Sequence, residues 1–164
     1  MQTTALLDVC DWIDASALSQ LIQTTPWVVP TLQTVHILAI AVVLASGLML
    51  ALRTARLSGA DQPLAQAIRR AASSLWPALA VLLMSGSLLA IGEPARSLAN
   101  DYFQIKMLLL VVACILFVLL QGSVGRRAAL QTGGDAGGRE LTLAWLGLAC
   151  WVGIAIAGRW IAYL

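Results

Sequence analysis

A single histidine, His36, lies within TLQTVHILAI at residues 31–40, a stretch that otherwise has the character of a membrane span. Imidazole is the commonest axial ligand of haem and a good ligand for copper. A neutral ring can instead hydrogen-bond to a neighbouring helix, with Gln33 as a second polar group one turn earlier on the same face. The pattern therefore predicts either a packing contact or a ligand site at His36, and the residue types leave both open.

Three further ionisable residues fall near the same end of the apolar segments: Glu93, Lys106 and Arg159. At 1.5 Å per residue, His36 lies roughly 13 Å inside its span, and Lys106 and Arg159 lie about one turn from the ends of theirs. Two cations and one carboxylate would suit an anionic or quinone-like headgroup in a cleft. The alternative is that all three are interfacial residues that pair with each other or reach lipid headgroups. They would then accompany an aromatic belt of Trp27, Tyr102, Trp160 and Tyr163.

A metal or haem site would need ligands beyond His36, because one histidine cannot provide both axial ligands of a low-spin haem. A haem b would require His36 from a second copy of the chain, a methionine or another subunit. Three side chains fall at a comparable depth and form a conceivable copper site with it: Met84, Cys114 and Cys150. The same residue types are also ordinary packing residues in apolar helices.

The composition is that of an integral membrane protein. Of the 164 residues, 60% are hydrophobic and 11% are charged, and the mean hydropathy is +0.86; soluble domains are close to half apolar and about a quarter charged. A net charge of +2, without basic runs interleaved with aromatic residues, argues against a nucleic-acid partner. The sequence has no Ser-His-Asp set, HExxH motif or glycine-rich phosphate loop, so it does not predict an enzyme.

Four apolar segments are long enough to cross the roughly 30 Å hydrocarbon core as helices. We expect these spans at about 27–52, 73–92, 103–122 and 141–163. Over 4–23, apolar residues recur every three or four positions and aspartates occupy others, which is typical of an amphipathic helix on the membrane surface. The sequence therefore predicts an all-α fold with one domain, residues 1–164. That domain is an integral membrane four-helix bundle with an N-terminal amphipathic interfacial helix.

Basic residues are concentrated in two of the predicted loops. Seven of the ten lysines and arginines lie there: Arg53, Arg56, Arg69, Arg70, Arg126, Arg127 and Arg139. The positive-inside rule places these loops in the cytoplasm. We therefore expect the N-terminus, a short loop at 93–102 and the C-terminus to lie outside. The first residues turn acidic without a positive signal-peptide region, so the N-terminal segment is expected to be retained.

Four segments together resemble an uncharacterised, domain-of-unknown-function family of small four-pass bacterial inner-membrane proteins: WVVPTLQTVHILAIA (27–41), LWPALAVLLMSGSLLA (75–90), NDYFQIKMLLL (100–110) and GRWIAYL (158–164). The resemblance covers nearly the whole chain. It implies a four-helix bundle in a bacterial cell membrane, with His36, Lys106 and Arg159 as recurring polar positions. More distantly, the layout is similar to copper-resistance and cytochrome-b-like membrane bundles, which carry more histidines. Gln121 stands where many relatives would have a second histidine, which argues against a function that needs two.

The function predicted from these observations is that of a non-enzymatic membrane subunit or accessory protein. Its polar cluster of His36, Gln33, Glu93, Lys106 and Arg159 would bind a small ligand or a redox partner. One alternative is a b-type haem electron carrier in which two copies present His36 across a homodimer interface. Another is a metal or small-solute permease, which would need oligomerisation because four spans offer little for a pathway. The expected partners are the lipid bilayer and either further copies of the chain or a larger membrane complex.

Overall fold

The structure is a computed structural model that describes residues 2–58, 62–98, 100–129 and 136–160. Every regular element in these residues is a helix, which confirms the predicted all-α class. In chain order the helices are α1 (Gln2–Asp14), α2 (Ala17–Thr24), α3 (Val28–Thr54), α4 (Leu64–Gly92), α5 (Pro94–Leu98), α6 (Asp101–Ala129) and α7 (Gly138–Trp160).

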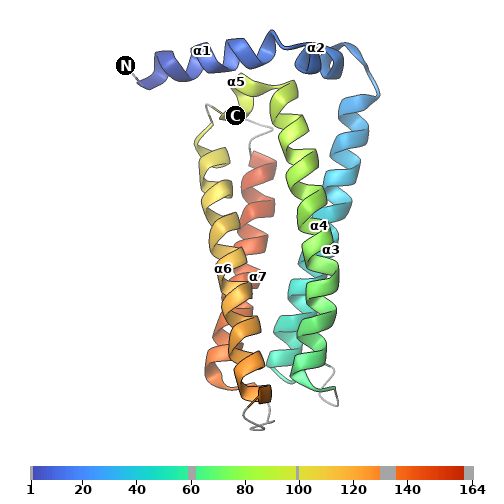
Figure 1. The fold of residues 1–164 in the computed structure, drawn as a ribbon, viewed down its shortest axis with the longest axis vertical. Coiled ribbons are helices and arrows are strands. Elements are labelled where there is room, and N and C mark those ends of the chain that lie inside the picture. The colour runs from blue at the N-terminus through green and yellow to red at the C-terminus, as the bar shows by residue number, and fades with distance from the viewer. Residues whose placement is uncertain (1, 59–61, 99, 130–135, 161–164) are drawn as a thin grey trace.

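Within the described residues, four helices are long and apolar enough to cross a membrane by length and composition: α3, α4, α6 and α7. They run side by side along the long axis of the molecule (Figure 1). In lipid, a helix satisfies its backbone hydrogen bonds within itself, which makes such segments suitable as spans. The chain therefore has the architecture of a multi-pass membrane protein. α4 begins nine residues before the predicted apolar span and α6 continues seven residues beyond its span, because both helices extend through polar turns.

The four long helices pack as two hairpins, α3 with α4 and α6 with α7. The hairpins meet where α3 contacts α7, whereas α4 and α6 touch much less. Small residues allow the close approaches. A Cβ on Gly47 would lie 3.5 Å from Trp151, and one on Gly153 would lie 3.3 Å from Leu109. A hydrogen bond of 3.2 Å between the Ser46 and Ser74 hydroxyls adds a polar contact between α3 and α4.

One end of the bundle, here called the arginine-rich end, comprises the end of α3, the start of α4, the end of α6 and the start of α7, and it contains most of the buried core. Leu75, Ala113 and Leu120 are almost completely buried there. Arg53 is also buried; its Nε donates to the Gln62 carbonyl at 2.9 Å, and its Nη2 donates to the same oxygen. This contact closes the turn between α3 and α4.

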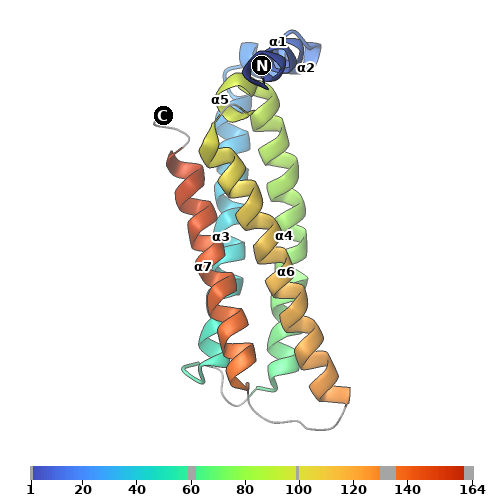
Figure 2. The same ribbon diagram turned by 90° about the vertical axis from the view of Figure 1, so that its left-hand side faces the viewer.

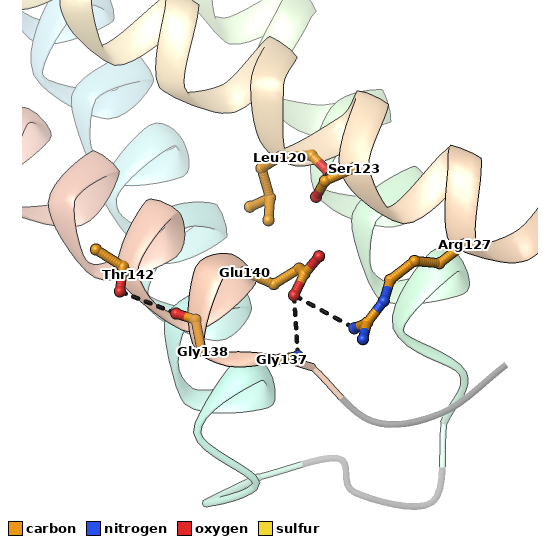
Figure 3. Close-up of polar contacts among 7 residues, drawn as sticks. All are labelled: Leu120, Ser123, Arg127, Gly137, Gly138, Glu140 and Thr142. Carbon is orange, nitrogen blue, oxygen red and sulfur yellow. Dashed lines mark hydrogen bonds and ion pairs between the residues drawn. The ribbon is translucent and has the colours of Figure 1, made fainter. Parts of the chain in front are cut away.

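A carboxylate clasp joins α6 to α7 at the arginine-rich end (Figure 3). Glu140 is 4% exposed, and its Oε2 accepts from the Gly137 backbone N–H at 2.9 Å and from Arg127 Nη1 at 3.3 Å. Glu140 lies in the first turn of α7, where a negative charge also interacts favourably with the helix dipole. The clasp thus holds the start of α7 against the last turn of α6.

The opposite end, here called the capped end, is covered by α1, α2 and α5 (Figures 1 and 2). The single interfacial helix predicted over 4–23 is instead two helices, because Ser16 adopts an extended conformation and its side chain accepts from the Ser19 N–H as an N-cap. The loop predicted at 93–102 also contains a helical turn, α5. Together, α1, α2 and α5 cover this end of the four long helices.

The helix α2 is fixed to the last turn of α4 by hydrogen bonds. Ser19 Oγ donates to the Ile91 carbonyl at 2.8 Å, and Gln23 Nε2 donates to the Gly92 carbonyl at 3.0 Å. The last carbonyls of a helix lack hydrogen-bond donors within that helix, and α2 supplies two donors to the end of α4. Gly92 is required at this crossing, since a Cβ there would come within 2.8 Å of the Ile22 side chain.

Candidate functional site

Two adjoining cavities occupy the capped half of the bundle. The first has a volume of about 320 Å³ and is lined by residues of all four long helices, α3, α4, α6 and α7, together with Ile13 of α1. The second, of about 340 Å³, lies toward the capped ends of α3 and α7. His36 and Lys106 line both cavities. The capped half is therefore hollow on both sides of these two side chains.

All five residues that the sequence analysis selected as ligand-binding candidates line the second cavity: Gln33, His36, Glu93, Lys106 and Arg159. They come from α3, the end of α4, α6 and α7, so the fold brings together positions up to 126 residues apart, from 33 to 159. His36 and Lys106 are partly buried at the centre, and Gln33, Glu93 and Arg159 form an exposed rim. The arrangement is a polar mouth above an apolar interior.

His36 is held from α4 by Ser85. The distance between His36 Nδ1 and Ser85 Oγ is 2.8 Å, and the same hydroxyl donates to the Val81 carbonyl one turn earlier at 2.6 Å. A serine hydroxyl has one proton to donate, so Ser85 accepts from His36 Nδ1–H while its own proton goes to Val81. Space for the ring comes from Gly86, where a Cβ would lie 3.3 Å from His36 Cε1.

This pair of contacts favours the tautomer of His36 that is protonated at Nδ1, which leaves a lone pair on Nε2. The ring faces the two cavities that it lines, so Nε2 can accept a hydrogen bond from a ligand or bind a metal. A hydrogen bond to the second ring nitrogen is also the usual way in which a metal-bound histidine is oriented. The contact with Ser85 is the hydrogen bond to a neighbouring helix that one interpretation of His36 predicts, and Nε2 is available to a ligand, as the other interpretation requires.

Lys106 is the only lysine in the sequence, and it enters the bundle from the second turn of α6. Its Nζ lies 3.8 Å from the position that a Cβ on Gly158 would take, so the ammonium group reaches across to α7. In the ranges that the structure describes, this ammonium group donates no hydrogen bond to a side chain or carbonyl and forms no ion pair. Burying an ammonium group without a counterion is unfavourable. The cluster thus contains a cation directed into a largely apolar space.

The conceivable mixed copper site is not assembled in this structure. Met84 is 68% exposed, and neither it nor Cys114 nor Cys150 lines a cavity with His36. Over the described parts of the chain, no three His, Cys, Asp or Glu residues gather closely enough to hold a metal ion.

Aromatic residues accompany the rim at the capped end. Trp27 and Trp160 are exposed, and Trp160 stacks on Tyr102 with 6.3 Å between ring centroids and 15° between planes. Tyr163, the fourth residue of the predicted aromatic belt, lies outside the described residues. The stacked pair connects α6 to α7 beside Arg159.

Two contributors to the site were not selected by the sequence analysis. Ser85 determines the orientation of His36, and Ile13 of α1 reaches the first cavity. A serine followed by glycine in the middle of an apolar span, Ser85-Gly86, was the available signal for the first. No local signal places Ile13, because its position depends on how α1 crosses the bundle.

The chain belongs to the family of unknown function DUF6644, whose model matches residues 9–164. No curated protein and no solved structure matches it.

Proposed function

We propose that this DUF6644 chain is a non-enzymatic membrane subunit or accessory protein that binds a small ligand in the hollow, capped half of its bundle. The observation that carries the proposal is the convergence of Gln33, His36, Glu93, Lys106 and Arg159 on one cavity. Ligand sites are usually concave, mostly apolar and equipped with a few convergent polar groups, and they lie between the helices of bundles.

Filling the cavities without touching the polar groups tests this function. Ala90 of α4 lines both cavities, whereas Ala80 on the same helix is exposed and lines neither. We expect protein purified from its native host in a neutral detergent to carry a small molecule that is lost in Ala90→Phe and kept in Ala80→Phe. Mass spectrometry of organic extracts measures this. Equal recovery from both variants would contradict binding in the cavities.

A b-type haem electron carrier is the second candidate, and the fixed orientation of His36 with Nε2 available supports it. The second axial ligand would be His36 of another copy of the chain or Met107, which lines the first cavity together with His36. This candidate requires a haem band in the reduced-minus-oxidised visible spectrum and its loss in His36→Ala. A flat spectrum of protein from its native host excludes it and leaves the first proposal standing.

The proposed location is a bacterial inner membrane with the capped end outside. Seven of ten basic residues support this orientation because they are in or next to the connections at the arginine-rich end. The site would then face the outer leaflet, where a larger membrane complex or a second copy of the chain has access to it. Labelling of a single cysteine at Thr24 or Arg126 in intact cells tests the orientation, and only Thr24→Cys is expected to react with an impermeant reagent.

A further inference from the structure

We infer that the ligand is a single-chain amphiphile with an acidic headgroup, which the protein takes from the bilayer and holds with its headgroup at Lys106. This inference rests on the proposed function and specifies the ligand. It combines the charge of the polar mouth, the apolar character of the first cavity and the weak contact between α4 and α6.

The charges that line the first cavity favour an anion. Lys106 is the one charged residue among the described residues that line it, and the same ammonium group also lines the second cavity beside Arg159. Glu93 is the single carboxylate among the described lining residues of either cavity, and it lies at the exposed rim. A carboxylate or phosphate group at Lys106 would supply the counterion that the described residues do not provide.

The interior of the first cavity favours a hydrocarbon chain. Below Lys106 it is lined by Leu44, Leu82, Leu110 and Trp151, together with Val43 and Ile154. About 320 Å³ is at the lower end of the range for ligand pockets, which suits one acyl chain better than the two chains of a phospholipid. A ligand with an acidic head and one apolar tail matches both parts of the site.

The packing of the bundle gives this ligand an entrance from the lipid. α4 and α6 make few contacts with each other, and residues of both helices line the first cavity. Met107 on α6 and Leu83 on α4 line the cavity and are also exposed on the surface of the long helices. A chain can therefore move between α4 and α6 without leaving apolar surroundings, and Ile13 of α1 covers the cavity above.

The test is a binding measurement on the full chain in neutral detergent, with native mass spectrometry as the readout. Three probes share an eighteen-carbon chain and differ in the headgroup: oleate, 1-oleoyl lysophosphatidate and oleyl alcohol. We expect one molecule of an acidic probe to bind at least tenfold more tightly than oleyl alcohol. Binding of oleate alone identifies a carboxylate ligand, and binding of the lysophosphatidate alone identifies a phosphate ligand.

Matched variants assign the two parts of the site. Lys106→Met is expected to lower acidic-probe binding at least tenfold, to the level of the alcohol, whereas Lys106→Arg and the charge-matched control Arg126→Met retain it. Ala90→Phe is expected to abolish binding of all three probes, and Ala80→Phe to leave it unchanged. Circular dichroism and gel filtration confirm that each variant is folded.

The outcomes separate this inference from the function on which it rests. If oleyl alcohol binds as tightly as the acids, or if Lys106→Met binds them normally, the acidic ligand is wrong while loss in Ala90→Phe still supports a ligand cavity. If no probe binds and the small molecule recovered from the native host is the same for Ala90→Phe and wild type, both the inference and the proposed function are wrong.

Discussion

The two ends of the bundle treat buried polar groups in different ways. At the arginine-rich end, Glu140 accepts from Arg127 and from a backbone N–H. Arg53 donates to a carbonyl through Nε and Nη2, while its buried Nη1 has no partner among the described residues. At the capped end, His36 has one anchored nitrogen, and Lys106 reaches into a cavity. The difference shows that the same four helices can close around charge at one end and leave space around it at the other.

This contrast is visible along a single helix. On α4, Leu75 is 1% exposed within the core of the arginine-rich half, whereas Leu83, about two turns further along, is 47% exposed and lines the first cavity. Both residues lie in one continuous apolar helix, so hydrophobicity does not distinguish them. What differs is the surroundings: Leu75 lies within the buried core, whereas Leu83 lines the first cavity.

The largest expected effect is the loss of a large side chain from the packed half. Leu75→Ala should lower the free energy of unfolding by about 2–5 kcal/mol, because it leaves a cavity among residues that cannot collapse into it. Leu83→Ala removes the same atoms beside an existing cavity and should cost less than about 0.5 kcal/mol. Equilibrium unfolding in sodium dodecyl sulfate from neutral micelles measures both. Similar losses would remove the distinction between the two halves.

The next effect comes from adding volume. Ala113 of α6 is fully buried in the packed half, and Ala113→Phe should destabilise the protein by about 1–3 kcal/mol through overpacking. Ala90→Phe places the same ring in the hollow half and should change the unfolding free energy by less than about 0.5 kcal/mol. The same unfolding titration compares the two variants. A large loss in Ala90→Phe would mean that the cavities close in the folded protein.

A smaller effect is expected from the clasp at the arginine-rich end. Glu140→Gln keeps the shape of the side chain but replaces charge-assisted hydrogen bonds by neutral ones, which should cost about 1 kcal/mol. Thermal unfolding followed by circular dichroism, with Glu93→Gln at the exposed rim as the matched control, measures it. If the control lost as much stability as Glu140→Gln, burial of the carboxylate would not be the reason.

The smallest effect on stability is expected at the histidine. Ser85→Ala removes one hydrogen bond between α3 and α4, and such bonds in membrane proteins average about 0.6 kcal/mol. The substitution also removes the hydrogen bond that constrains the tautomer of the His36 ring. Nitrogen NMR of labelled imidazole is expected to show Nδ1 protonated in the wild type and a mixture of tautomers in Ser85→Ala. An unchanged spectrum would show that Ser85 does not orient His36.

Much of the architecture follows from the sequence because apolar length and helix formation are local properties in a membrane. The segments around His36 and Lys106 are long apolar runs, and each forms a helix. The break between α1 and α2 is also encoded locally, because Ser16 caps the start of α2 by accepting from the Ser19 N–H. The amphipathic pattern continues across this break, so the pattern alone does not predict it.

The geometry of the site was less accessible to sequence analysis. Depth along the spans predicts His36, Glu93, Lys106 and Arg159, and helical spacing adds Gln33 to the face of His36. Their meeting in one cavity depends on the rotation of each helix, which four uniformly apolar helices do not specify. The clasp between Arg127 and Glu140 was missed for a related reason. The two lie thirteen positions apart, on either side of a glycine-rich connection, so no helical spacing relates them.

The docking of α2 on α4 has a consequence for the order in which the protein is assembled. Synthesis proceeds from the N-terminus, so α2 leaves the ribosome before the carbonyls of Ile91 and Gly92, to which Ser19 and Gln23 donate, have been made. α2 can therefore dock only after synthesis of α4, the second span, is complete. This part of the capped end can therefore form before α6 and α7, which line the same cavities, have been made.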